Sequence, residues 1–128
     1  MSNWRWVPKS VVLAIHDRQI AQHGGLDGVR DMGAIESALA RPENLQAYGS
    51  PDAADLAAAY LFGLAKNHGF ADGNKRIAWI TARLFLMDNG LKLAFDQRDA
   101  VTTVEAVAGG AVSENELAEW FRSKLSSS

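Results

Sequence analysis

The sequence predicts an all-α protein, a compact bundle of about six short helices. Its 128 residues fit a single domain, and 48% apolar with 22% charged residues is the composition of an ordinary globular protein. Apolar residues recur at helical spacing between glycine and proline punctuation. With no internal repeat or linker, residues 1–125 are expected to form one domain and residues 126–128 a disordered tail.

Proline, glycine and aspartate place the first two helices. Pro8 near the first turn, with a glycine pair as the stop signal, predicts a helix over residues 8–23. Asp31 can cap a second helix, which is expected to end before Pro42. The segment RPENLQAYG, residues 41–49, is then predicted as a polar loop.

A third helix is expected to begin at Ser50, Pro51 and Asp52, which supply a cap, a first-turn proline and an acid. It should run to about His68. Its consecutive alanines and one glycine make it slim enough for a neighbour to pack closely. Gly69 stands where a left-handed residue often ends a helix.

A fourth helix is expected from Gly73 or Asn74 to residues 89–90. Its apolar positions predict a core stripe of Ile77, Ile80, Leu84 and Met87.

Two further helix signals lie near the end of the chain. The segment LKLAF, residues 91–95, is too short to classify. A fifth helix is expected from about Asp96 or Asp99 to Gly109, and the sequence SENE at residues 113–116 is a capping box for a sixth.

Composition excludes several classes of protein. The absence of cysteine rules out a disulfide framework and a thiolate metal site. The N-terminal segment lacks the apolar core of a signal peptide, and the most apolar run is too short to cross a bilayer. We therefore expect a cytoplasmic protein with no membrane partner.

The charge is unevenly distributed. The overall net charge of −2 argues against direct nucleic-acid binding. Residues 62–92 hold five cationic side chains and two carboxylates, a net charge of +3, so the rest of the chain is at −5. A local basic excess of this size suits a small anion better than a long polyanion.

That basic excess surrounds the segment NHGFADGNKRIAW, residues 67–79, which joins the third and fourth predicted helices. The start of a helix presents unpaired N–H groups and a partial positive charge. Lys75 and Arg76 oppose that charge unless an anion binds there, and Gly73 lets a ligand approach the backbone closely. Arg76 offers a planar fork for phosphate and Lys75 a point charge. The sequence thus predicts a phosphate site.

Three neighbouring side chains extend this site. Asp72 could hold Mg²⁺, because nucleotide and water would supply the other ligands. His68 could take a proton from a hydroxyl nucleophile, and Asn74 could hold the loop or donate to a phosphate oxygen. Plainer alternatives stay open: His68 could complement a helix dipole, Asp72 could be a cap, and Lys75 and Arg76 could be solvated.

Other site chemistries fit less well. The phosphate loop GxxxxGK[ST] is absent. A zinc site would need more ligands than His68 and Asp72, and His16 and His23 belong to the first helix, which we expect to be distant. Arg83 lies two turns beyond Arg76 on the same face of the fourth helix and could position Asp72 or an acid elsewhere.

The segment HGFADGNKR resembles the Fic/Doc superfamily signature, H-x-F-x-[D/E]-[G/A]-N-x-R. The matching positions are His68, Phe70, Asp72, Gly73, Asn74 and Arg76. Upstream, GVRDMGAIESALARP resembles the N-terminal part of death-on-curing (Doc) toxins, and ENELAEWFR is similar to their closing helix. The resemblance implies a Fic/Doc-type bundle whose active site is a helix–anion loop–helix unit.

The resemblance also implies roles for the motif. Fic proteins transfer AMP from ATP to a hydroxyl of a target protein. By that likeness His68 would be the base, Asp72 the Mg²⁺ ligand, and Gly73, Asn74 and Arg76 part of the anion hole.

Lys75 favours one branch of the superfamily. AMP-transferring members usually carry glycine at this position, whereas Doc toxins carry NKR as here. Doc toxins phosphorylate elongation factor Tu with the γ-phosphate of ATP, which blocks translation. Lys75 would occupy the space needed for AMP transfer and hold the terminal phosphates, so phosphoryl transfer is favoured.

Some features depart from the Doc pattern. Gly69 replaces the proline common after the histidine, and Gly73 is the Fic-like residue where the best-known Doc motif has alanine, which keeps AMP transfer open. A catalytically inactive nucleotide- or partner-binding module is the other alternative.

Two partner surfaces follow from the same resemblance. The inhibitory helix [S/T]-x-x-x-E-[G/N] is absent, so restraint is expected in trans from a Phd-like antitoxin. Residues 41–49 stand where a target-docking flap is suggested, with a plain surface loop as the alternative. Phe70 and the tryptophans, Trp4, Trp6, Trp79 and Trp120, are expected to pack rather than stack on a ligand.

Overall fold

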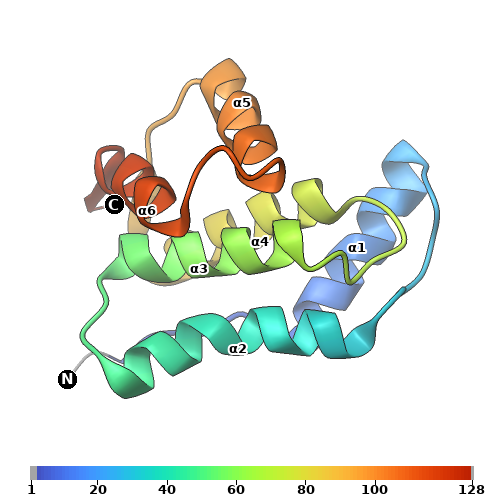
Figure 1. The fold of residues 1–128 in the computed structure, drawn as a ribbon, viewed down its shortest axis with the longest axis horizontal. Coiled ribbons are helices and arrows are strands. Elements are labelled where there is room, and N and C mark those ends of the chain that lie inside the picture. The colour runs from blue at the N-terminus through green and yellow to red at the C-terminus, as the bar shows by residue number, and fades with distance from the viewer. Residues whose placement is uncertain (1–2, 128) are drawn as a thin grey trace.

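The computed structural model describes residues 3–127 and confirms the all-α class. The described chain contains α1 (Lys9–His23), α2 (Met32–Tyr48), α3 (Ala53–Lys66), α4 (Asn74–Asp88), α5 (Gln97–Ala108), α6 (Glu114–Arg122) and two short strands, β1 (Leu91–Leu93) and β2 (Leu125–Ser127). Helix α3 runs through the middle of the bundle, between α2 on one side and α5 and α6 on the other (Figure 1). No helix within residues 3–127 has the length and apolarity that crossing a membrane requires.

Helix α3 is as slim as its sequence predicts. Ala57, Ala58 and Ala59 have no exposed surface. A Cβ atom added to Gly63 would lie 2.9 Å from Cδ of Arg41 and 3.1 Å from the Cβ of an alanine on α2. Because small side chains let backbones approach closely, α2 and α4 both pack directly on α3.

The predicted end of the second helix was wrong. Helix α2 continues through Pro42 to Tyr48, so residues 41–49 are mostly helical and not an extended docking flap. Proline interrupts the backbone ladder, but Pro42, with Ile35 and Leu39, lies on the buried side of α2. Burial of that face against α3 outweighs the missing hydrogen bond.

Two predictions about α3 and α4 need correction. Asp52 caps α3 in place of Ser50, since its carboxylate accepts from the N–H of Asp55 in a reciprocal capping box. On α4, Met87 is 64% exposed and Ile80 is only partly buried, whereas Phe85 belongs to the core. The buried face of α4 consists of Ile77, Ala78, Thr81, Ala82, Phe85 and Leu86. The prediction counted only large apolar residues and left out the small residues of α4, so the predicted core face is turned about the helix axis from the observed one and shares only Ile77 with it.

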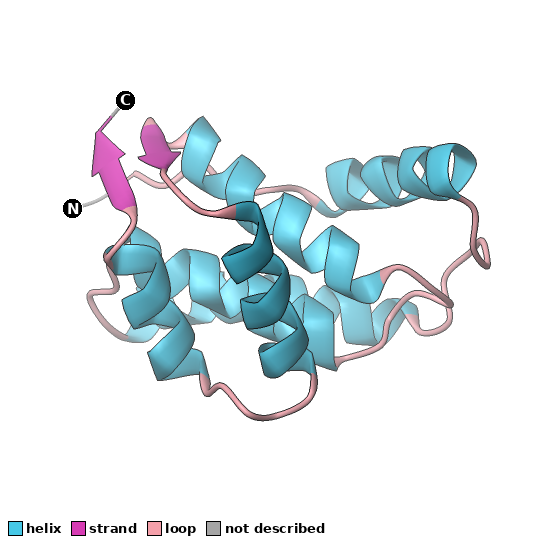
Figure 2. Cartoon of the chain, turned by 90° about the horizontal axis from the view of Figure 1, so that it is seen from above, coloured by secondary structure: helices cyan, strands magenta, loops and turns pink. Residues whose placement is uncertain are grey.

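The unclassified segment after α4 forms part of a small sheet. Strand β1 pairs antiparallel with β2, with Leu93 opposite Leu125. Figure 2 shows the two strands at the end of the molecule where the chain termini lie. Ser126 and Ser127 are therefore in β2, where a disordered tail was expected, and Ser128 lies outside the described residues.

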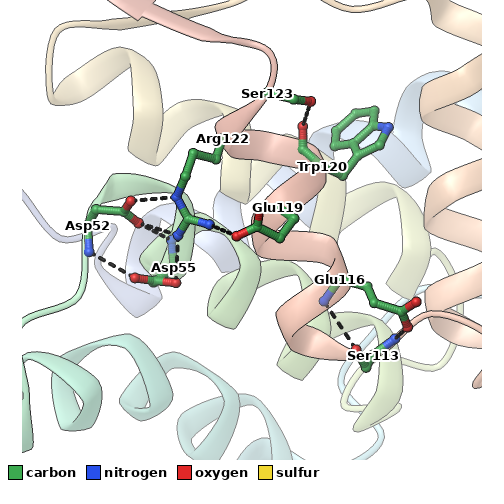
Figure 3. Close-up of polar contacts among 8 residues, drawn as sticks. All are labelled: Asp52, Asp55, Ser113, Glu116, Glu119, Trp120, Arg122 and Ser123. Carbon is green, nitrogen blue, oxygen red and sulfur yellow. Dashed lines mark hydrogen bonds and ion pairs between the residues drawn. The ribbon is translucent and has the colours of Figure 1, made fainter.

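The last helix is tied to the start of α3 by charge. Ser113 and Glu116 form the predicted capping box of α6. At the other end of α6, Arg122 donates to Asp52 at 2.7 and 3.0 Å and to Asp55 at 3.0 Å (Figure 3). The bonds from Arg122 lower the pKa of Asp52 from 3.8 to about 2.

Removing this cation should make the protein less stable in a pH-dependent way. Asp52 has a lower pKa when folded, so its contribution is complete above pH 3.8 and disappears as the pH falls towards about 2. We expect Arg122→Gln to lower the free energy of unfolding by about 0.5–1 kcal/mol near pH 7, because exposed pairs are screened by water. This loss should shrink below about pH 4 in urea titrations.

Lys9→Gln is the control, since it breaks an exposed pair with Glu36 at 2.6 Å that involves no helix cap. A loss in Arg122→Gln that stays constant from pH 7 to about pH 2 would show that the charge on Asp52 is not its source.

Candidate active site

The loop between α3 and α4 is braced from inside by Asn74. Its side-chain oxygen accepts from the N–H of Phe70 at 3.0 Å, and its nitrogen donates to the carbonyl of Phe70 at 3.0 Å. Phe70 is 2% exposed, as expected for a core residue. Asn74 therefore holds the loop, and one amide hydrogen remains for a phosphate oxygen, so that role stays a prediction.

The loop turns at His68 and not at the glycine after it. His68 has φ of +52°, the one non-glycine residue with positive φ in residues 3–127, so the expectation of a left-handed Gly69 was wrong. A left-handed conformation costs a residue with a Cβ about 1–2 kcal/mol. Strain of this kind gathers at functional positions. His68 is exposed and lines a cleft that is described below.

Gly69 is required for a different reason. A Cβ there would lie 2.3 Å from Cγ1 of Ile35 on α2, so no side chain fits. The carbonyl of Gly69 accepts from the backbone N–H groups of Arg30 and Asp31 at 2.8 and 2.9 Å. These contacts hold the segment in place without the proline that many Fic motifs carry.

The α1–α2 connection is the backbone partner of the loop. Ala71 donates to the carbonyl of Gly28 at 3.1 Å, and Val29 forms an antiparallel bridge with Phe70. The sequence suggested only a turn in this region, because a pairing between segments about forty residues apart has no local signal. The connection reaches the cleft through Gly25, whose added Cβ would lie 2.7 Å from Oδ2 of Asp72.

Asp72 has an exposed carboxylate with backbone partners. Its Oδ1 accepts from the N–H of Gly73 at 2.8 Å and its Oδ2 from the N–H of Leu26 at 3.2 Å. Each oxygen keeps a further lone pair. The carboxylate lines the cleft next to two cations, so its setting fits a Mg²⁺ ligand completed by nucleotide and water.

His16 lies directly beneath this loop, so the expectation that it is distant was wrong. It is 1% exposed, and its Nε2 lies 2.9 Å from the carbonyl oxygen of Asp72. Ligand atoms of His16, Asp17 and Asp27 also lie within 4.8 Å of one another. The sequence held one signal that His16 is buried. It follows Val12 by four residues, so the two side chains share one face of α1, and both are buried.

Helix α4 begins without a cap. Gly73, its N-cap residue, has φ of +78° and no side chain to accept from the first N–H groups, and the first turn contains no acid. Lys75 and Arg76 are exposed, and neither forms an ion pair or hydrogen bond with another side chain of residues 3–127. The positive charge at this helix start is therefore left for an external anion.

A cleft of about 1260 Å³ opens over this helix start. Its walls are the end of α1 with the residues that follow it, the loop with the first turns of α4, and α5. Its lining includes His68, Asp72, Gly73, Asn74, Lys75 and Arg76, so all the predicted site residues meet in one cleft. The cleft has room for a small-molecule ligand.

Arg83 and the four tryptophans pack against other side chains of the bundle. The guanidinium of Arg83 lies 5.7 Å from the ring of Trp79 and 5.0 Å from that of Phe95, so it contacts rings rather than Asp72. Trp79 also contacts Trp120, and all four tryptophans pack against the core as expected. Trp79 lines the cleft as well, so the expectation that it does not stack on a ligand stays a prediction.

Comparison with known proteins defines the class of this protein. The model of the Fic/DOC family matches residues 6–86, which include α1, α2, α3, the whole loop and most of α4. The chain therefore belongs to the Fic/Doc family.

Two similar proteins narrow the likeness to the Doc branch. "Protein kinase doc" of Escherichia phage P1 is 34% identical over 119 residues, which are 92% of this chain and 94% of the relative. "Toxin Doc" of Mycolicibacterium smegmatis is 48% identical over 77 residues, 57% of this chain and 58% of the relative.

The left-handed turn at position 68 can be tested by stability. We expect His68→Gly to have a free energy of unfolding about 0.5–1 kcal/mol higher than that of His68→Ala in urea titrations. Glycine relieves the strained φ, although it costs some conformational entropy. The same pair at Asn67, where φ is −83°, is the matched control and should show the opposite order. Greater stability of the alanine variant at position 68 would contradict the left-handed turn.

Proposed function

We propose that this protein is a Doc-type toxin that transfers the γ-phosphate of ATP to a hydroxyl side chain of a protein target. The observation that carries the proposal is the uncapped start of α4, where Lys75 and Arg76 have no acidic partner among the described residues and face one cleft with His68 and Asp72. The likeness to a protein named "Protein kinase doc" along 92% of the chain supports phosphoryl transfer.

The residues divide the chemistry among them. The target oxygen bonds to the γ-phosphorus, the bond from that phosphorus to the β,γ-bridging oxygen breaks, and ADP leaves. His68 accepts the hydroxyl proton, and Lys75 and Arg76 hold the terminal phosphates through the charge and N–H groups of the helix start. Asp72 would hold Mg²⁺, which when bound neutralises charge on the phosphates. Gly73 keeps the backbone accessible at that point.

The partners of this reaction are also proposals. Elongation factor Tu is the proposed target, and a Phd-like antitoxin supplied in trans is the proposed inhibitor. Lys75 is the Doc-like residue of the motif and favours γ-phosphate transfer. Gly73 is the Fic-like residue and leaves AMP transfer as the second candidate.

Labelled ATP distinguishes these two reactions. With elongation factor Tu and Mg²⁺, we expect label from the γ-phosphate and none from the α-phosphate to appear on the target. His68→Gly should lower the rate by about 10²–10⁴-fold because the base is lost. Asp72→Asn should remove the response to added Mg²⁺. Transfer of α-label alone would establish AMP transfer, and nucleotide binding without any label transfer in a lysate would indicate an inactive binding module.

Lys75 provides a test of branch specificity. We expect Lys75→Gly to lower γ-phosphate transfer by about 10–100-fold, because a charge on the terminal phosphates is lost. Lys75→Arg should keep part of the activity. The matched control is Lys9→Gly, a first-turn lysine of α1 that lies outside the cleft. Undiminished γ-transfer in Lys75→Gly would remove the lysine from the mechanism.

A further inference from the structure

His16 is a buried polar side chain beneath the catalytic loop that the proposed reaction does not use. It is 1% exposed, and its ring stacks on Phe70 at 3.9 Å between centroids and 14° between planes. Its Nε2 lies 2.9 Å from the carbonyl oxygen of Asp72. A carbonyl oxygen can only accept, so Nε2 carries the hydrogen and donates it.

This bond determines the direction of the next N–H group. The peptide between Asp72 and Gly73 is trans, so its C=O and N–H point in opposite directions. Because the carbonyl is held inwards on His16, the N–H of Gly73 points away from His16, to the side where it meets Oδ1 of Asp72 at 2.8 Å. The same peptide thus orients both the amide at the start of α4 and the carboxylate of Asp72.

The backbone does not provide this orientation unaided. Gly73 has φ of +78°, a conformation that glycine adopts about as readily as its mirror image. Rotation of the peptide between Asp72 and Gly73 therefore meets little steric resistance from the residue itself. A Cβ added at Gly73 would lie 3.8 Å from Nε2 of His16, an ordinary van der Waals distance, so the imidazole lies beside this glycine without crowding it.

A closed set of contacts keeps the imidazole in place. The Asn74 amide brackets the backbone of Phe70, the Phe70 ring stacks on His16, and His16 donates to Asp72. Asn74 is the first residue of α4, so this chain of contacts begins and ends at the start of that helix.

We propose that His16 is a positioning residue that fixes the Asp72–Gly73 peptide, and through it the metal-binding carboxylate and the phosphate-binding helix start. This inference deepens the proposed phosphoryl transfer and rests on it for its kinetic consequence. His16 itself contacts neither nucleotide nor target, and it acts through the Asp72 carbonyl.

Two substitutions separate hydrogen-bond donation from packing. His16→Gln can place an amide N–H near the position of Nε2, and His16→Leu fills similar space without a donor. Val12→Ala is the control, because Val12 is buried on α1 one turn earlier and does not line the cleft. It reports what a loss of α1 packing alone does to turnover.

The kinetic test measures γ-phosphate transfer at varied Mg²⁺ and target concentrations. We expect His16→Leu to lower kcat by about 10–100-fold and raise the Mg²⁺ requirement, with the KM for the target within about twofold. His16→Gln should return to within about threefold of the wild-type kcat. A His16→Leu enzyme that matches Val12→Ala, or a His16→Gln enzyme as impaired as His16→Leu, overturns the proposal.

A spectroscopic test on the free protein keeps the inference separate from the proposed function. In ¹H–¹⁵N spectra, the Gly73 amide signal should shift or broaden in His16→Leu and stay near its wild-type position in His16→Gln and Val12→Ala. If the wild-type protein transfers no phosphate, the proposed function fails while this measurement still decides the role of His16. An unchanged Gly73 signal in His16→Leu overturns the positioning role whatever the activity.

Discussion

Backbone pairing between the α1–α2 connection and the loop before α4 is the constraint on which the site depends. The carbonyl of Gly69 accepts from Arg30 and Asp31, and Ala71 donates to the carbonyl of Gly28. This pairing brings the loop so close to α2 that position 69 has no room for a side chain. The chain then leaves α3 through a left-handed turn at the preceding residue, so the orientation of His68 follows from backbone packing.

The charge at the start of α4 is tolerated because the rest of that helix is well buried. Helices α2, α3, α5 and α6 each have a side-chain cap, whereas α1 and α4 have none, and α4 carries two cations directly after its first residue. Its apolar and small residues pack along α3, and that burial holds the helix without help from its first turn. Positive charge without an acidic partner at a helix start lowers stability locally. Functional sites commonly contain such unfavourable features, because a bound ligand can compensate for them.

Local signals predicted much of the fold and failed where packing intervened. Asp31 and Ser113 cap their helices as expected, because a cap bonds to an N–H only three residues away. Pro42 did not end α2, since burial against α3 decided the length of that helix. Met87 was expected in the core and is exposed, because the small residues of α4 face α3. The strand partner of β1 lies more than thirty residues away and left no mark in the segment itself.

The sequence by itself determined the helical class, the family and the set of side chains that meet in the cleft. Those properties rest on periodicity, on caps and on one motif of nine residues, all of them local. Only the tertiary structure decided that His68 and not Gly69 turns the chain, that Arg83 faces aromatic rings, and that His16 supports Asp72. The last contact joins residues 56 positions apart. It exists because α1 packs beside α4, and such packing depends on the whole bundle rather than on any short stretch of the chain.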